Sequence, residues 1–522
     1  MRASNRVFLN TGVLYGRLLI TMGITLYSTR LVLNALGDVN YGIFNLIAGI
    51  ILMLSFLNAA MTTSTQRYLS FYQGKNDLKM QRAVFSNSLI LHIFIGLLVV
   101  FGLEITGLFL FDGVLNIPQD RIEAAKIIYH FMSATVFFTI LAVPFNGSLV
   151  AHENMIWIAV VNIIETVLKL GIAICLFYVS SDKLITYGLL TAGISIISFC
   201  LYAWFCLTKY EECSLKIINV ADKKLIKELG SFAGWNLFGA LCSLGRNQGL
   251  AIILNLFYGA KVNATYGIAN QVNSQLNFFS ATLLRALNPQ IMKSEGLGDR
   301  ARMLRLSMMA SKFGFFLVSL FAVPVIFEIG TILNIWLKRP PASAAIFCSL
   351  FLVSSMISQL SVGLQSAVQA TGKIKIYQMV VGTILLLSLP LSYITLRMGY
   401  PAHYVIFSII LIEIIAAVFR LFFVRSLTGM SILLYFSRVI NRVILPIALS
   451  VVVCYLSVSY LEFKYRFLIT GLSSALIFMV SIYFFGLCDD EKGIVKNLWS
   501  KIQGKIKYGK AISKENPSES SL

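Results

Sequence analysis

Three arginines lie inside long apolar runs, where no water is available to solvate a charge. Arg17 is nine residues into the run at 8–33, roughly 13 Å deep at a helical rise of about 1.5 Å per residue, and Arg246 lies well inside the run at 229–258. Arg30 lies near the far end of the first run. A cation at the centre of a membrane span costs about 2.5–3.5 kcal/mol, so such a side chain should face a cavity or a partner. We therefore expect these arginines to bind an anionic substrate.

A second charged group follows helical spacing in the run at 155–179. Asn162, Glu165 and Lys169 are three and four residues apart, so they share one helical face, with the acid before the base in the favoured order. We expect Lys169 to present its charge to the same anion, and Glu165 to tune that charge or to bind a coupling cation such as H+ or Na+. Two alternatives stay open: the pair only neutralises itself against a neighbouring helix, and the arginines snorkel to the nearer membrane interface.

Amide and hydroxyl side chains make two further runs, at 264–287 and 342–369, too polar to face lipid. Packing between helices would also explain such side chains. Taken together, the two runs predict a hydrated cavity between helix bundles. The polar residues that we expect to line it are Asn162, Asn270, Asn273, Asn277, Ser358 and Gln365.

The composition requires a membrane to position these residues. Of 522 residues, 57% are apolar and 13% are charged, whereas a soluble domain has about 25% charged residues. The net charge of +20 comes from cations at the ends of apolar runs and in the C-terminal tail, which argues against nucleic-acid binding. The sequence has no GxxxxGK[ST] loop and no HExxH or similar metal spacing. We expect no catalytic residue, no metal site and no cofactor.

Fourteen runs are long enough to cross a bilayer core, which takes about 20 apolar residues per helix. They are continuous, unlike the alternating segments of a membrane barrel, so we expect α-helices. Lys and Arg number 27 in one set of connections and eight in the other, so we expect the first set and both termini in the cytoplasm. The expected spans are 8–33, 41–62, 84–111, 123–149, 155–179, 184–207, 229–258, 264–287, 304–337, 342–369, 375–396, 402–424, 440–461 and 466–487.

An internal repeat divides these spans into two sets. Leu33-Asn34-Ala35-Leu36-Gly37 recurs as Leu254-Asn255-Leu256-Phe257-Tyr258-Gly259, and Tyr41-Gly42-Ile43 recurs as Tyr266-Gly267-Ile268. Six spans separate the copies, so both have the same orientation, related by a pseudo-two-fold axis along the membrane normal. We predict an all-α polytopic membrane protein with four parts: an N-terminal six-helix bundle at 1–210, a C-terminal six-helix bundle at 225–427, two additional transmembrane helices at 438–487, and a basic cytoplasmic tail at 488–522.

Two segments resemble those of a known family. Arg30 to Leu46 reads Arg-Leu-Val-Leu-Asn-Ala-Leu-Gly-Asp-Val-Asn-Tyr-Gly-Ile-Phe-Asn-Leu, and Thr65 to Ser70 reads Thr-Gln-Arg-Tyr-Leu-Ser. With two repeats of six helices plus two, the chain resembles the polysaccharide-biosynthesis branch of the multidrug/oligosaccharidyl-lipid/polysaccharide exporter superfamily, the O-antigen-type flippases. The resemblance covers about residues 5 to 487.

The resemblance implies a flippase for polysaccharide or O-antigen lipopolysaccharide biosynthesis in the bacterial cytoplasmic (inner) membrane. Such a protein moves an undecaprenyl-diphosphate-linked oligosaccharide from the inner to the outer leaflet by alternating access. It also implies that arginines in a central cavity hold the diphosphate, a role that carries over to Arg17, Arg30 and Arg246; Lys169 is added from its own position. The implied partners are the lipid-linked oligosaccharide, membrane lipids and glycan polymerases.

Two other classes of protein stay open. An ion-coupled multidrug antiporter would hold cations at carboxylates, but the first and seventh spans contain no Asp or Glu. A membrane glycan polymerase or glycosyltransferase would carry catalytic acids or His in a large outer loop, and the longest expected outer loop, at 112–122, is short. Moving two negative charges outward across about 100 mV releases about 4–5 kcal/mol, so membrane potential or an ion gradient is the expected energy source.

Overall fold

The chain is an all-helical, multi-pass membrane protein. The computed structural model describes residues 3–52, 55–111, 117–214, 222–337, 339–463, 465–493 and 496, and these residues contain no strand. Twelve of the described helical segments are long and apolar enough to cross a membrane, which confirms the predicted fold class. The predicted spans 41–62 and 264–287 are not among the twelve, and 41–62 includes residues outside the described ranges. The number fourteen therefore stays a prediction, and most of the predicted tail at 488–522 lies outside the described residues.

The helices follow one another with short connections. In chain order they are α1 (Ala3–Leu52), α2 (Ser55–Gly74), α3 (Leu78–Phe109), the single turn η2 (Gln119–Arg121), α4 (Ile122–Leu141), α5 (Val143–Ala151), α6 (Met155–Cys175), α7 (Lys183–Lys209), α8 (Lys223–Gly296), α9 (Arg300–Phe327), α10 (Ile329–Leu337), α11 (Ala344–Thr371), α12 (Lys375–Leu386), α13 (Ser388–Arg397), α14 (Tyr404–Thr428), α15 (Ile432–Tyr435), η3 (Phe436–Ile440), α16 (Asn441–Tyr460), α17 (Arg466–Ser481) and η4 (Ile482–Gly486).

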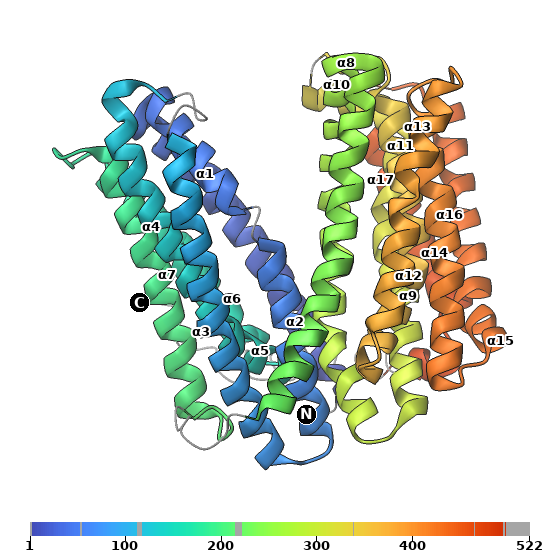
Figure 1. The fold of residues 1–522 in the computed structure, drawn as a ribbon. Helices are drawn as coiled ribbons and strands as arrows, with labels where there is room; N and C mark the ends of the chain where they lie inside the picture. Colours follow the sequence, from blue (N-terminus) through green and yellow to red (C-terminus); the bar gives the residue numbers. More distant parts are fainter. Residues whose placement is uncertain are drawn as a thin grey trace, which may run out of the picture.

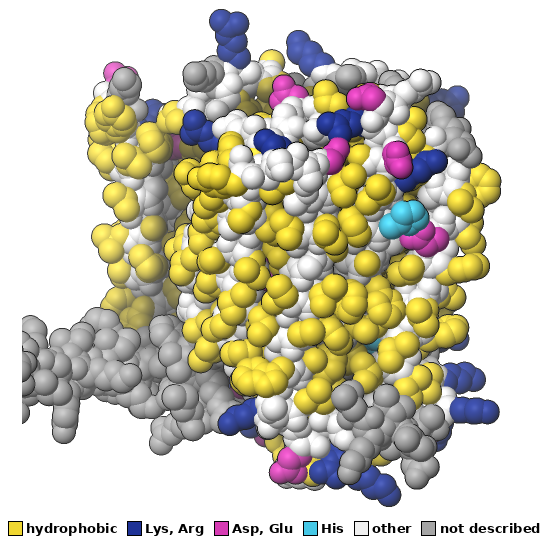
Figure 2. All heavy atoms as spheres, turned by 90° about the vertical axis from the view of Figure 1, so that its left-hand side faces the viewer, with side chains coloured by type: hydrophobic (Ala, Val, Ile, Leu, Met, Phe, Trp, Pro, Cys, Tyr) yellow, Lys and Arg dark blue, Asp and Glu magenta, His cyan; other side chains and the backbone are white. Residues whose placement is uncertain are grey.

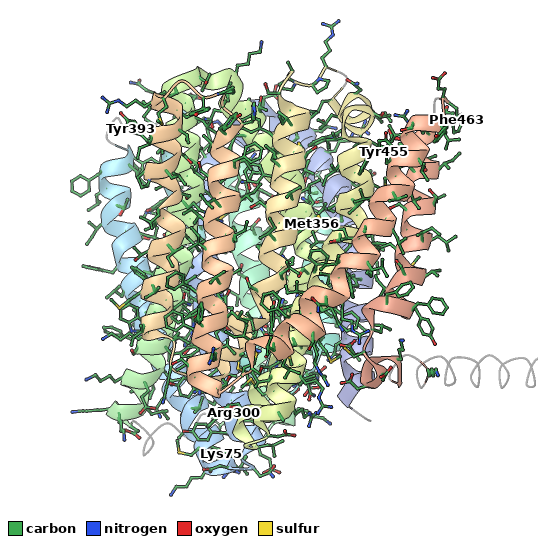
Figure 3. All side chains as sticks on the ribbon, turned by 90° about the vertical axis from the view of Figure 1, so that its right-hand side faces the viewer. Lys75, Arg300, Met356, Tyr393, Tyr455 and Phe463 are labelled. Carbon is green, nitrogen blue, oxygen red and sulfur yellow. The ribbon has the colours of Figure 1, made fainter. Side chains whose placement is uncertain are left out.

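Two groups of helices meet at one end of the molecule and diverge toward the other (Figure 1). One group contains α1 and α3 to α7, and the other contains most of α8 together with α9 to α17; α2 lies where they meet. We call residues 3–214 the first half and residues 222–428 the second half. Figure 3 places Lys75 and Arg300 at the end where the halves meet, and Tyr393, Tyr455 and Phe463 at the opposite end. We call the end with Lys75 and Arg300 the basic end.

The longest helices, α1 and α8, each bend at one glycine. Gly37 has φ 74° and ψ 167°, and Gly259 has φ 71° and ψ −170°. This backbone conformation is essentially restricted to glycine, because a Cβ would clash with the neighbouring carbonyl. The two glycines occupy matching positions in the repeated motif, so both copies interrupt a long helix at the same point.

The two halves are fastened together at the basic end. A Cβ on Gly74 of α2 would collide with the Lys293 carbonyl of α8, so the helix ends touch through their backbones. Glu153, in the connection between α5 and α6, accepts hydrogen bonds from Lys293 Nζ at 2.8 Å and Gln290 Nε2 at 2.7 Å. Its backbone carbonyl accepts one from Asn10 at 2.8 Å. Because the Glu153 side chain is only 2% exposed, this cluster is a buried contact between the halves.

The outer surface suits a bilayer. On the face of the first half, hydrophobic side chains cover the middle, and most Lys and Arg gather toward the two ends (Figure 2). Exposed apolar residues of α3 such as Phe94, Phe101 and Leu108 belong to this cover. A continuous apolar surface of this height is stable only against lipid.

The two additional helices, α16 and α17, pack on each other and on α9. Just after η4, the chain is tied to α9 by a buried lysine. Lys312 Nζ donates to Glu491 Oε2 at 2.5 Å and to the Gly486 carbonyl at 3.1 Å, and the Lys312 side chain is 1% exposed. The Cys488 backbone N–H also donates to Glu491 Oε2, at 2.8 Å.

Candidate functional site

The first half contains a polar cavity of about 260 Å³ between α2, α4, α5, α6 and α7. Arg17 of α1 donates from Nη1 to Asn162 Oδ1 at 3.1 Å, and Asn162 in turn donates to the Tyr202 hydroxyl at 3.2 Å. Glu165, one turn beyond Asn162 on α6, lines the same cavity and interacts electrostatically with Arg17. These contacts hold the Arg17 guanidinium at the cavity wall.

A second arginine reaches this cavity from the other half of the chain. Arg285, on the part of α8 that follows the Gly259 bend, lines the cavity and donates to Asn146 Oδ1 at 3.3 Å. Arg285 and Arg17 are close enough to repel each other. Glu165 is the one carboxylate in the cavity lining, so two guanidiniums share a single negative charge.

The second half contains a matching set of charges. Arg246 of α8 donates to Glu413 Oε1 at 2.6 Å, and Arg420 lies 3.6 Å from Glu413 Oε2. Arg420 also donates to Ser361 Oγ at 2.8 Å and interacts with the Tyr377 hydroxyl. The Glu413 side chain is only 7% exposed. Burial of an acid between two arginines leaves this cluster with one surplus positive charge.

Arg420 opens onto a cavity of about 280 Å³ between α2 and the second-half helices α8, α11, α12 and α14. Amide side chains dominate its polar lining. Gln369 and Gln378 both donate to Asn236 Oδ1, at 3.3 Å and 3.1 Å, while Gln365 lies beside them. Amides and hydroxyls that can both donate and accept are the usual partners of sugar hydroxyls.

The two clusters thus have the same composition: two arginines, one glutamate and one tyrosine each. Each cavity is closed by a helix from the opposite half, since α2 contributes Thr63 to the second cavity and α8 contributes Arg285 to the first. The surplus of guanidinium over carboxylate in both clusters makes them suited to an anion that can accept several N–H hydrogen bonds.

Two predicted site residues lie apart from these cavities. Arg30 and Lys169 are both exposed, and neither makes an ion pair in the part of the chain that the structure describes. Ser28 Oγ donates to the Lys169 backbone carbonyl at 3.4 Å, which brings this part of α1 next to α6. The predicted helical face of α6 is therefore divided: Asn162 and Glu165 line the first cavity, whereas Lys169 lies beyond it.

Of the predicted polar residues of α8, Asn277 joins this helix to α11. Asn277 accepts hydrogen bonds from Ser355 at 2.7 Å and from Gln359 at 2.9 Å, both on α11, and donates to Asn273 Oδ1. Ser358 donates to the backbone of its own helix. Asn270 is half-buried, and its backbone carbonyl accepts a hydrogen bond from Ser274 Oγ at 2.8 Å. Of the residues expected to line a cavity, Asn162 and Gln365 line the two described above.

Sequence reasoning missed three charged residues of the two clusters. The patterns described above single out none of Arg285, Arg420 and Glu413. A search for every ionisable residue at mid-span would have found Glu413 and Arg420, because they lie seven residues apart on one face of α14. Nothing in the sequence indicated that Arg285 reaches into the opposite half.

The family follows from comparison with known proteins. A family profile described as "Polysaccharide biosynthesis protein" matches residues 7–295, so the chain belongs to that family. The chain is also similar to the uncharacterized membrane protein EpsK of Bacillus subtilis (strain 168), with 21% identity over 322 residues, which are 61% of this chain and 63% of EpsK. The alignment therefore spans less than two thirds of that relative.

Solved structures define the fold as that of the MATE transporters of the MOP superfamily. A crystal structure of a MATE transporter in the bent conformation superposes with a TM-score of 0.72 at 12% identity, covering 82% of this chain and 98% of the other. An outward-facing multidrug resistance MATE transporter gives a TM-score of 0.68 at 13% identity, covering 82% and 95%. A MOP transporter from Pyrococcus furiosus gives 0.68 at 13% identity, covering 82% and 98%. The chain is thus a membrane protein of the polysaccharide-biosynthesis family with a MATE-type fold.

Proposed function

We propose that this chain is a flippase that moves an undecaprenyl-diphosphate-linked oligosaccharide from the inner to the outer leaflet of the bacterial inner membrane. The observation that carries the proposal is the surplus of arginine in the two clusters beside the cavities. A diphosphate brings about two negative charges, and its oxygens match the paired N–H groups of a guanidinium. The polyprenyl chain stays in the surrounding lipid during transport.

The binding roles follow from the two clusters. Arg17 and Arg285 bind the diphosphate in the first cavity, and Arg246 and Arg420 hold it in the second. The amide lining beside Gln365 binds the first sugars. Such a division suits a substrate with one charged headgroup and a long neutral glycan, because each part finds partners of its own chemistry.

Transport proceeds by alternating access between the halves. The basic end faces the cytoplasm, since connections rich in Lys and Arg remain on that side. In the described conformation the halves therefore diverge toward the outer face. Arg30 and Lys169 lie exposed along this open part, where they guide the diphosphate after it leaves Arg17.

The membrane potential supplies the driving force. Outward movement of two negative charges across about 100 mV is worth about 4–5 kcal/mol. Glu165 is the candidate for binding H+ or Na+, because it lines the first cavity beside Arg17. A cation bound to Glu165 would weaken the attraction between Glu165 and Arg17. Arg17 would then be released for the substrate, or the cation would compete with Arg17 for the carboxylate.

An ion-coupled multidrug antiporter is the second candidate, supported by the MATE fold and by the one carboxylate in each cluster, Glu165 and Glu413. The excess of guanidinium favours an anionic substrate instead. The Pyrococcus furiosus protein, with the same fold, is itself described as having a binding pocket of reverse polarity that suggests a different function.

Flipping of a fluorescent lipid-diphosphate oligosaccharide in proteoliposomes tests the proposal. We expect Arg17→Gln and Arg285→Gln each to lower the initial rate about 10- to 100-fold, because each removes a charge-assisted hydrogen bond of about 1.5–3 kcal/mol. Arg425→Gln is the matched control: Arg425 is an exposed arginine of α14 outside both cavities, and its loss should leave the rate unchanged.

Two outcomes would contradict the proposal. Export of a cationic drug in exchange for H+ or Na+, with no movement of the lipid-diphosphate, would select the antiporter. Flipping at the wild-type rate by both arginine variants would remove the diphosphate site. A flipping rate that does not change with an imposed membrane potential or with ion gradients would refute only the proposed driving force.

A further inference from the structure

A third cavity lies at the basic end of the second half, apart from the two arginine clusters. It has a volume of about 740 Å³ and forms where α8 and α12 begin and α14 ends, with Tyr68 of α2 at its edge. The transport role proposed above makes no use of it. Its charged lining consists of Lys224, Lys227, Glu228, Lys373 and Lys375.

The charge of this cavity is strongly positive. Four lysines face one glutamate, and all four are exposed, so their ammonium groups are free to meet a ligand. Lys375 Nζ lies 5.5 Å from the centre of the Trp235 ring, which holds one ammonium over the cavity wall. Beneath the cavity, the buried Arg67 guanidinium packs against Gly372, a lining residue, and donates to the Ala370 carbonyl at 3.1 Å.

The first turn of α12 adds backbone N–H donors to the positive charge of this cavity. No side chain caps its first turn, so its leading N–H groups lack a side-chain acceptor. In contrast, α8 begins with Asp222, which accepts hydrogen bonds from the N–H groups of Lys224 and Leu225. An uncapped helix start carries a partial positive charge and N–H groups without an acceptor. It therefore adds to the attraction of the lysines for an anion.

The remaining lining is apolar and opens toward lipid. Phe232, Trp235 and Phe423 provide aromatic walls, and Ile376 is 65% exposed at the cavity edge. A water-soluble anion would gain nothing from an exposed isoleucine at the membrane boundary. A ligand with a charged head and hydrocarbon chains would satisfy both parts of the cavity.

We propose that this cavity binds the headgroup of an anionic phospholipid from the leaflet at the basic end, with the acyl chains running past Ile376. Basic pockets between transmembrane helices at this depth bind phosphate headgroups, and each Lys near the surface contributes about fivefold in affinity. The cavity includes Tyr68 of the first half together with Phe232 of the second, whose rings lie 5.8 Å apart. A bound headgroup therefore lies against the contact that joins the halves.

Fluorescence quenching of Trp235 tests the proposal. In the full-length chain the other tryptophans (Trp157, Trp204, Trp336 and Trp499) are replaced by Phe, and acyl-brominated lipids are added to nanodiscs. We expect brominated phosphatidylglycerol to reach half-quenching at a mole fraction at least about fivefold below that of brominated phosphatidylcholine. Lys373→Gln with Lys375→Gln should abolish this preference.

The matched control removes two other exposed lysines near the basic end, through Lys79→Gln with Lys209→Gln, and should keep the preference. Equal quenching by both lipids in the parent protein would overturn the proposal. So would displacement of the brominated lipid by undecaprenyl diphosphate at a lower mole fraction than unlabelled phosphatidylglycerol, which would assign the cavity to the transported lipid. In the unsubstituted chain, phosphatidylglycerol should also raise the melting temperature more than phosphatidylcholine, and equal shifts would contradict the site.

Discussion

At the scale of single residues, the two arginine clusters are incompletely satisfied. Arg17, Arg246 and Arg420 each have a buried Nε without a hydrogen-bond partner among the described residues. A buried network with free donors costs stability, and an apolar replacement would often be no worse. The cost is explained if a substrate completes the network. In this interpretation Glu413 is an internal counter-ion that the diphosphate replaces.

Glu413→Gln tests this role of the carboxylate. We expect the change to destabilise the protein by about 3–5 kcal/mol, because it leaves two arginines without their shared negative charge. Adding Arg420→Met should recover part of the loss, since the second charge is then absent as well. Unfolding in detergent of both single variants and the double variant measures the coupling. Strictly additive losses would show that Glu413 and Arg420 do not stabilise each other.

At the scale of elements, the bends in α1 and α8 determine where the clusters lie. The chain after each glycine turns back toward the basic end, and the second part of α8 carries Arg285 into the first half. The repeated motif predicted this correspondence, because Gly37 and Gly259 are matching residues with matching backbone angles.

Gly259→Ala should disturb the bend. A side chain at a φ of 71° and a ψ of −170° costs about 1–3 kcal/mol, so we expect a lower melting temperature and a loss of flipping from the displacement of Arg285. Gly267→Ala is the control in the same helix, because Gly267 has ordinary helical angles and no atom within 4 Å of an added Cβ. Equal effects of the two substitutions would mean that the bend at Gly259 is dispensable.

Much of this arrangement could be predicted from the sequence, and the remainder depends on contacts between distant segments. Apolar length predicted the helices, and buried charge pointed to Arg17 and Arg246, which do lie in arginine clusters. The pairing of Arg246 with Glu413 joins residues from α8 and α14, and no local pattern records it. Lys169 shows what helical spacing cannot predict. Residues on one helical face project to the same side of the helix, but the spacing does not tell how far along the helix the cavity extends, and the cavity ends before Lys169.

At the scale of the whole molecule, the halves are closed at one end and apart at the other. Glu153 is central to the closure, because its buried carboxylate holds Lys293 and Gln290 of the second half. In the proposed alternating access, this contact would break in each cycle. On that proposal, the strength of this contact sets the balance between the two orientations.

Glu153→Gln should shift that balance toward opening at the basic end. In a background without native cysteines, and in inside-out membrane vesicles that expose the proposed cytoplasmic face, we expect Ser294→Cys, a site that is 1% exposed, to react about tenfold faster with a maleimide that cannot cross membranes. Glu211→Gln is the control, since Glu211 is exposed and pairs with Arg82 inside the first half. An unchanged labelling rate in the Glu153 variant would place the closure elsewhere.

The tie between Lys312 and Glu491 has a practical consequence for handling this protein. A fusion partner or affinity handle joined after residue 493 retains the carboxylate that neutralises a fully enclosed ammonium on α9. A junction at residue 487 would delete that carboxylate and leave the Lys312 ammonium buried without a counter-ion beneath the last two helices. Truncated variants of the protein should therefore end no earlier than residue 493, whichever affinity tag is attached.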